Sequence, residues 1–153
     1  MTPWSGDDVW FMQKALDEAW EAERRDEVPI GAVLVSEGLL VGRGHNAPIS
    51  STDPTAHAEV QALRSAGAWL KNYRFAGSTL YVTLEPCLMC FGALVHARVA
   101  RVVFGASDPK VGVSRLLPRL EEANLNHRIE FQGGLMEAEC RELVQRFFQR
   151  RRG

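Results

Sequence analysis

Two short segments of the sequence each combine candidate metal ligands with residues that begin helices. They are residues 53–59 (DPTAHAE) and residues 86–90 (PCLMC). We expect Asp53 to cap a helix whose first turn contains Pro54, because both residue types are common at those positions. Pro86 presets the backbone at the start of the second segment. The sequence therefore predicts two helices that begin beside candidate ligands.

The side chains of these segments are spaced so that they can meet only beyond the helix ends. Cys87 and Cys90 are three residues apart and share one face of a helix. His57 and Glu59 are two residues apart and would point in nearly opposite directions on a helix flank. They converge only on a target near the helix axis, off its end. This spacing predicts a metal between two helix N-termini, whose positive dipole ends also favour thiolates.

Each segment alone has an ordinary interpretation. A single histidine at a helix start is usually a cap or a surface group, and a Cys-x-x-Cys pair also serves redox chemistry or half of a structural zinc site. The two segments together resemble the zinc-dependent nucleobase deaminases. A set of three protein ligands, His57, Cys87 and Cys90, leaves a fourth position for water, as in a catalytic zinc site. Glu59 is then the proton carrier; the alternative is a first-turn acid that suits the helix dipole.

The composition is that of one globular domain, which we place over residues 1–153. Hydrophobic residues make up 46% of the chain and charged residues 24%. There is no long apolar run and no basic, apolar start, so we expect neither a membrane span nor a secretory signal. Two of the three cysteines belong to the metal site, which indicates a reducing compartment, the cytoplasm. We expect the third, Cys140, to be a small core residue.

The formal net charge of −1 argues against a protein whose whole surface binds polyanions. The C-terminal end is nevertheless basic, and it contains one acid, Glu142. It is either a solvated helix end or a tail that contacts phosphates, and composition leaves both open. The arginines concerned are Arg141, Arg146, Arg150, Arg151 and Arg152.

The pattern of apolar residues, glycines and prolines predicts alternating strands and helices. A strand, a helix and a strand in succession around the second segment imply a right-handed parallel crossover. The predicted fold is a three-layer α/β/α sandwich with a mixed five-stranded sheet, as in the cytidine deaminases. In chain order we expect a helix from Asp7 to about Arg25, strands over residues 29–35 and 39–44, a helix from the first segment to Gly67, a strand over residues 78–83, a helix from Cys87 to about His96, a strand over residues 99–104, a weaker segment over residues 116–123, a strand over residues 128–132 and a closing helix over residues 137–151.

Beyond the two segments, most of the chain resembles the bacterial tRNA-specific adenosine deaminases. The resemblance implies conversion of the wobble adenosine of a tRNA anticodon stem-loop to inosine, by a homodimer with one zinc ion per subunit. It also implies that a zinc-activated water attacks C6 of a flipped adenine while Glu59 moves the protons. The likeness runs through residues 27–35, 53–59, 72–74, 80–87, 101–106 and 126–128.

The same resemblance implies which residues hold the substrate. A flipped base would enter beside Asn46, the anticodon loop would lie over the loop of Asp108, and Phe147, Phe148 and Arg152 would lie near the RNA. Asn46 and Asp108 each have an alternative as turn residues, since each lies just before a proline-containing turn. In the substrate interpretation, an ionised Asp108 accepts a hydrogen bond from a ribose hydroxyl and so helps to reject DNA.

Two features depart from the family pattern. Residues 109–114 contain proline and valine where the family more often has small residues, and no long basic tail precedes Gly153. We expect both to affect the substrate range more than the chemistry.

Two other functions share the zinc residues: a deaminase of free bases or nucleosides, and a non-catalytic RNA-binding zinc module. The module would need a fourth protein ligand, for which His127 and Cys140 are the candidates. We expect Glu85 to support the ligands or the structure.

Overall fold

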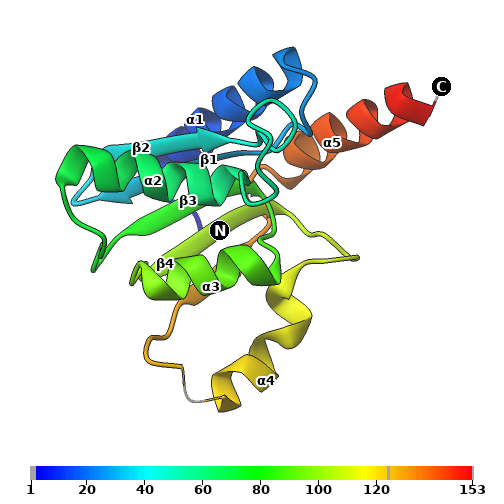
Figure 1. The fold of residues 1–153 in the computed structure, drawn as a ribbon. Coiled ribbons are helices and arrows are strands. Elements are labelled where there is room, and N and C mark those ends of the chain that lie inside the picture. Colours follow the sequence, from blue (N-terminus) through cyan, green and yellow to red (C-terminus); the bar gives the residue numbers. More distant parts are fainter. Residues whose placement is uncertain (1–2, 124, 153) are drawn as a thin grey trace.

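Five strands form one mixed sheet at the centre of the molecule (Figure 1). The computed structural model describes residues 3–123 and 125–152; Met1, Thr2, Asn124 and Gly153 of the predicted domain lie outside them. The strand order is β2-β1-β3-β4-β5; β1 is antiparallel to β2 and β3, and β3, β4 and β5 are parallel. The elements are α1 (Gly6–Arg24), β1 (Gly31–Ser36), β2 (Leu39–His45), α2 (Ala58–Leu70), β3 (Thr79–Leu84), α3 (Leu88–His96), β4 (Arg101–Ala106), the 3-10 helix η1 (Val113–Leu116), α4 (Leu117–Glu122), β5 (Glu130–Gly133) and α5 (Glu137–Arg152).

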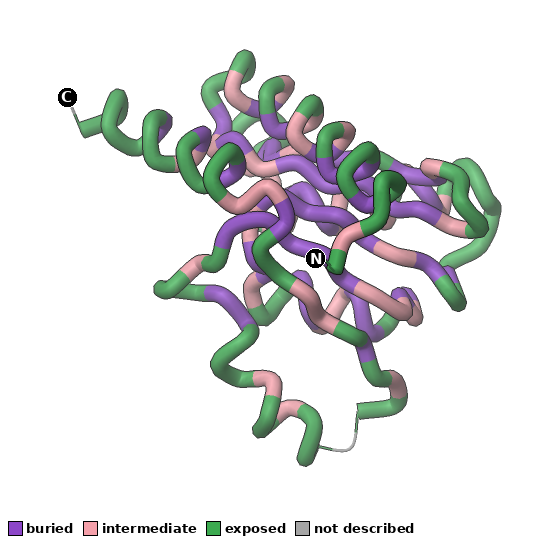
Figure 2. Tube along the Cα trace, turned by 180° about the vertical axis from the view of Figure 1, so that it is seen from behind, coloured by how far each residue is buried: buried purple, intermediate pink, exposed green. Residues whose placement is uncertain are grey.

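Helices cover both faces of this sheet, which confirms the predicted three-layer sandwich. The helices α1 and α5 pack on one face, and α2 and α3 pack on the other. Side chains alternate along the strands: Val33 and Val35 face α1, whereas Ala32 and Leu34 face the opposite layer. Figure 2 shows the buried trace running through the strands, with exposed turns on the outer helices.

A tight hairpin turn joins β1 to β2. Ser36 pairs with Leu39, and the two residues between them, Glu37 and Gly38, have φ values of 52° and 77°. Two successive positive φ values are typical of the tight turn whose twist matches that of the flanking strands. Glycine is suited to the second of these positions because it has no side chain to clash there.

Two glycines of β2 allow α2 to lie unusually close to the sheet. A Cβ atom on Gly42 would lie 2.4 Å from the carbonyl oxygen of Ala62, and one on Gly44 would lie 2.5 Å from that of Ala58. The facing side of α2 is made of alanines, among them Ala66. The small residues on both elements therefore fix the height of α2 above the sheet, and with it the position of the helix N-terminus.

Both predicted ends of α2 were wrong. The helix begins only after its N-cap residue, His57, whereas Asp53 accepts hydrogen bonds from the backbone nitrogen and Oγ1 of Thr55, at 2.9 and 2.7 Å. Asp53 thus closes a local turn instead of capping the helix. The helix also continues past Gly67 and ends where Lys71 takes a φ of 54°, the left-handed conformation common at helix C-termini.

Within residues 3–123 and 125–152, no helix combines the length and the apolar character that crossing a membrane requires.

A buried carboxylate joins α1 to the sheet. Asp8 lies in the first turn of α1, where it forms a capping box with Ser5, and its Oδ1 accepts hydrogen bonds from Tyr81 Oη at 2.6 Å and Arg101 Nη1 at 3.0 Å. Burial alone would raise the pKa of Asp8, but the hydrogen bonds from Arg101 and Tyr81 outweigh it and lower the pKa from 3.8 to about 2. The ionised carboxylate therefore stabilises the fold.

We expect Asp8→Ala to lower the free energy of unfolding by about 2–3 kcal/mol, because it leaves Arg101 and Tyr81 without their buried acceptor. Since the folded-state pKa lies below the unfolded one, the stabilisation by Asp8 is present above about pH 4 and is lost as the pH falls towards 2. Urea unfolding at several pH values measures both effects. The matched control is Asp7→Ala, an exposed acid in the same turn; an equal loss in the two variants would contradict the assignment.

Candidate active site

Three candidate ligands meet between the N-termini of α2 and α3, as the sequence predicts. His57 is the N-cap of α2, Cys87 is the N-cap of α3, and Cys90 lies in the first turn of α3. The Nδ1 atom of His57 lies 3.7 Å from Cys87 Sγ and 3.5 Å from Cys90 Sγ, and the three ligand atoms all lie within 4.8 Å of one another. Among the residues that the structure describes, this is the only such group of three.

The separations fit a tetrahedral zinc ion. Bonds of about 2.3 Å to sulfur and about 2.0 Å to nitrogen at the tetrahedral angle place the two ligand atoms about 3.5 Å apart. The hydrogen bonds with Cys90 and His57 lower the pKa of Cys87 to about 3. The contact with Cys87 and burial raise the pKa of Cys90, and the hydrogen bond with Cys87 raises the pKa of His57. The site therefore holds a thiolate that a cation would stabilise.

The predicted proton carrier lies at the same helix end. Glu59 is in the first turn of α2, two residues beyond His57, and only 4% of its surface is exposed. Burial raises the pKa of Glu59 to about 7, and the charge of His57 opposes part of that rise. A carboxyl group that titrates near neutral pH is suited to both accepting and returning a proton.

The candidate fourth ligands of a structural zinc site lie elsewhere. Cys140 is 1% exposed and packs in the core layer on the α1 side of the sheet, as expected for a small core residue. The Nε2 atom of His127 lies 2.6 Å from the carbonyl oxygen of Val99. With three protein ligands brought together among the described residues, the arrangement is typical of a catalytic zinc site and not of a closed structural one.

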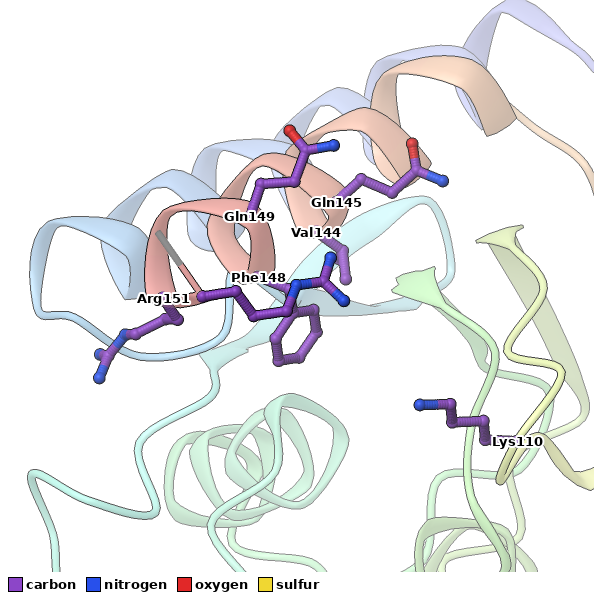
Figure 3. Close-up of a pocket in the computed structure, with 7 residues that line it drawn as sticks. Lys110, Val144, Gln145, Phe148, Gln149 and Arg151 are labelled. Atoms are coloured by element: carbon purple, nitrogen blue, oxygen red, sulfur yellow. The ribbon is translucent and has the colours of Figure 1, made fainter.

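A cavity of about 640 Å³ lies between the loop after β4, the start of β1 and α5. Three of the four predicted substrate residues line it: Asn46, Asp108 and Phe148. The fourth, Arg152, lines a neighbouring pocket of about 440 Å³, which shares Phe148 and Lys110 with the cavity. Figure 3 shows Phe148 extending from α5 into this pocket and Lys110 extending towards it from the opposite loop.

Asn46 connects the cavity to the metal ligands. Its Oδ1 accepts a hydrogen bond from the backbone nitrogen of Ala58, the residue directly after His57, at 2.9 Å. The side chain therefore holds the N-terminus of α2 and does not close its own turn. Asn46 is 8% exposed and lines the cavity, and its contact with a substrate stays a prediction.

Asp108 takes part in a turn. Its Oδ1 accepts hydrogen bonds from the backbone nitrogens of Lys110 and Val111, at 3.0 and 3.3 Å. This contact supports the alternative that the sequence left open, a carboxylate that shapes its own loop. The residue also lines the cavity. Its predicted contact with a ribose hydroxyl is tested by none of these distances.

Several arginines of α5 contact α1 and the turn that follows it. Arg150 forms an ion pair with Glu23 at 3.2 Å, and Arg151 donates a hydrogen bond to the carbonyl oxygen of Asp26 at 2.7 Å. The guanidinium of Arg146 lies over the ring of Trp20, 5.4 Å from its centroid. These three residues thus have partners within the protein; Arg151 also lines the pocket of Figure 3, as does Arg152.

One buried carboxylate near the cavity was not predicted from the sequence. Residues 24–27 are all charged, a composition typical of a polar turn, but Glu27 is only 2% exposed. Its carboxylate accepts hydrogen bonds from the backbone of a distant loop, at Ile49 and Ser50. No local pattern signals such a contact, because both donors lie more than twenty residues away in the chain.

We expect Cys87→Ser to abolish zinc binding and to destabilise the protein, since metal binding and folding are coupled at such a site. Zinc content per chain, measured on purified protein, and thermal unfolding with and without a chelator check this. Cys140→Ser provides the matched control: it changes a cysteine on the other side of the sheet and should keep about one zinc per chain. Zinc retained by Cys87→Ser would contradict the assignment of this ligand.

Comparisons with known proteins agree with this site. The family described as the cytidine and deoxycytidylate deaminase zinc-binding region matches residues 5–106. The tRNA-specific adenosine deaminase of Haemophilus influenzae (strain ATCC 51907 / DSM 11121 / KW20 / Rd) is 46% identical over 147 residues, which cover 95% of this chain and 85% of that protein.

Solved structures show the same relationship. A structure from work on A-to-I editing by tRNA:A34 deaminases at the wobble position of transfer RNA superimposes with a TM-score of 0.84 at 43% identity, covering 88% of this chain and 99% of that one. Guanine deaminase from Bacillus subtilis matches with a TM-score of 0.61 at 35% identity, covering 76% and 69%. The chain therefore belongs to the zinc-binding cytidine and deoxycytidylate deaminase family and, within it, to the tRNA-specific adenosine deaminases.

Proposed function

We propose that this protein hydrolyses the wobble adenosine of a tRNA anticodon to inosine and ammonia. The observation that carries the proposal is the cluster of His57, Cys87 and Cys90 with the buried carboxyl group of Glu59 at the same helix end. The membership of the chain among the tRNA-specific adenosine deaminases supports adenosine in RNA as the substrate.

The protein residues divide the chemistry between binding and proton transfer. His57, Cys87 and Cys90 hold zinc, which supplies a Lewis acid when bound. Glu59 accepts a proton from the attacking water and passes it to the ring nitrogen; it then carries the second proton, from the hydroxyl that the water leaves on C6, to the leaving amine of adenine. Water adds to C6, the C–N bond breaks, and the products are inosine and ammonia. Burial of Glu59 keeps this proton exchange away from bulk solvent.

The cavity and the adjoining pocket supply the substrate contacts in this proposal. The flipped base enters beside Asn46, whose amide suits a purine edge. Phe148 offers an exposed ring on which a base can stack, and Lys110 and Arg152 bring positive charge to the phosphates. Asp108 contacts the ribose. We infer that the enzyme acts as a homodimer in the cytoplasm, with one zinc ion per subunit.

We expect the zinc-loaded enzyme to release ammonia from an anticodon stem-loop RNA that contains the wobble adenosine. Glu59→Ala should keep about one zinc per chain and lose deamination by a factor of about 10²–10⁴, because general acid–base catalysis contributes that much. Metal analysis and an ammonia assay on the same sample separate the two properties. Loss of zinc together with the carboxylate would show that Glu59 is a ligand.

A substrate panel tests the proposed substrate class in the same assay. Free adenosine and guanine should be poor substrates, because neither can occupy the basic pocket that lies outside the base cavity. Faster turnover of either small molecule than of the RNA would indicate a nucleoside or free-base deaminase instead.

We expect neutralising Lys110 and Arg152 together to weaken RNA binding and to flatten its dependence on salt, by roughly one unit of log–log slope for each phosphate that the variant no longer neutralises. Binding titrations of the stem-loop at several salt concentrations measure this slope. The matched control is the double change Arg146→Gln and Arg150→Gln, because both residues contact α1. Equal changes of slope in the two pairs would refute the special position of the pocket residues.

A further inference from the structure

Two buried carboxylates near the cavity have no part in the proposed chemistry. Glu85 is 7% exposed and Glu27 is 2% exposed. Burying such groups is costly unless hydrogen bonds compensate, so their partners indicate what they stabilise. Each receives hydrogen bonds from two backbone N–H groups of one loop. The two loops carry or flank Asn46 and Asp108, which line the same cavity.

The carboxylate of Glu85 joins the loop that follows β4 to the first turn of η1. The backbone nitrogen of Asp108 donates to its Oε1 at 2.9 Å, and that of Ser114 donates to its Oε2 at 2.7 Å. Residues 108–114 therefore close on this single side chain. Since a backbone N–H needs an acceptor when it is shielded from water, the loop geometry depends on both oxygens.

Further contacts attach the same loop to the turn that carries the first cysteine ligand. The backbone nitrogen of Val113 donates to the carbonyl oxygen of Pro86 at 2.9 Å. Gly112 packs directly on the carboxylate: a Cβ atom at this position would lie 2.3 Å from Cδ of Glu85. The absence of a side chain at Gly112 is thus a steric requirement of the Glu85 contact.

Glu27 makes the equivalent contacts with the loop that follows β2. The backbone nitrogen of Ile49 donates to its Oε1 at 3.3 Å, and that of Ser50 donates to its Oε2 at 2.6 Å. This loop runs from Asn46 to His57, so it connects one wall of the cavity to the first metal ligand. The two glutamates come from different parts of the chain and support different loops.

We propose that Glu85 and Glu27 are positioning residues: Glu85 holds residues 108–114, whose first part lines the cavity, and Glu27 holds residues 47–53, which directly follow the cavity residue Asn46, in the geometry that binds RNA. The proposal rests on the proposed function for its substrate. It requires no contact between either glutamate and the RNA. Glu85 influences RNA binding by holding the loop that carries Asp108 and Lys110. Glu27 influences it by holding the loop next to Asn46.

Glutamine substitutions test the hydrogen bonds directly. A carboxamide has one acceptor oxygen and presents an NH₂ group to the second donor, so each variant leaves one loop N–H without its acceptor. In zinc-loaded Glu85→Gln, amide hydrogen exchange at Asp108 or Ser114 should become about tenfold faster or more, with Ile49 and Ser50 unchanged. Glu27→Gln should show the reverse pattern. Glu122→Gln, an exposed glutamate of α4, should change neither loop.

Kinetics on the anticodon stem-loop RNA separate positioning from a merely structural role. In Glu85→Gln we expect KM to rise about tenfold, as for the loss of one substrate hydrogen bond, while kcat changes by less than about threefold and zinc stays near one per chain. A merely structural role would reduce the fraction of active protein, which lowers the apparent kcat at unchanged KM. Gly112→Ala is the second variant, because its methyl group displaces the Glu85 carboxylate without removing it and also meets the carbonyl oxygen of Asp108, 2.5 Å away; a rise in KM of at least the same size is expected.

Each outcome of these measurements either supports or overturns the positioning role of the glutamates. Faster exchange confined to the loop of the substituted glutamate, together with a raised KM, supports the proposal. Unchanged exchange at Asp108 and Ser114, or an unchanged KM in both Glu85→Gln and Gly112→Ala, overturns it. If the parent enzyme releases no ammonia from RNA, the proposed function fails, and the exchange measurement alone still decides whether the glutamates hold these loops.

Discussion

The structure depends on the requirement that ligand atoms from two separate helices lie within a few ångströms of one point. Neither helix can satisfy this requirement alone, since His57 caps α2 and both cysteines belong to the start of α3. The sheet sets the distance between the N-termini of α2 and α3. Close packing of α2 on Gly42 and Gly44 fixes one N-terminus, and the parallel pairing of β3 with β4 fixes the crossover that carries the other. The thiolate at Cys87 then lies where the positive ends of both helix dipoles favour it.

The sequence was informative where a short range of residues decides the structure. The spacing of Cys87 and Cys90 and the position of His57 predicted the convergence of the ligands, and the strand patterns predicted the mixed sheet. Helix boundaries were less predictable, because Asp53 has a nearer partner in Thr55 than the helix could offer. The burial of Glu27 was not predictable at all: its acceptor role exists only once a loop from another part of the chain lies over it.

The basic C-terminal helix illustrates why charge composition alone left two interpretations open. A cluster of arginines in a sequence does not distinguish residues that bind phosphates from residues that join two helices. Tertiary contacts divide the cluster: Arg146 and Arg150 lie against α1, whereas Arg152 lines the pocket beside Phe148. An arginine that is already paired must give up its partner before it can bind RNA. This reduces the net free energy that it gains by binding a phosphate.

The zinc centre does not by itself choose the substrate. Guanine deaminase from Bacillus subtilis, at 35% identity, has a similar structure and is named for a different base. Discrimination must therefore come from the groups around the base and beyond it, at the cavity and the basic pocket. These walls are α5, the start of β1 and the loop after β4, and a loop is the part of a fold that varies most easily. A loop that must read a substrate also has to be rigid, since each mobile residue loses entropy on binding. A buried carboxylate that accepts hydrogen bonds from two backbone N–H groups makes a loop rigid by fixing the path of its backbone. The outward side chains of that loop remain free to differ between proteins, so the loop can be both rigid and variable.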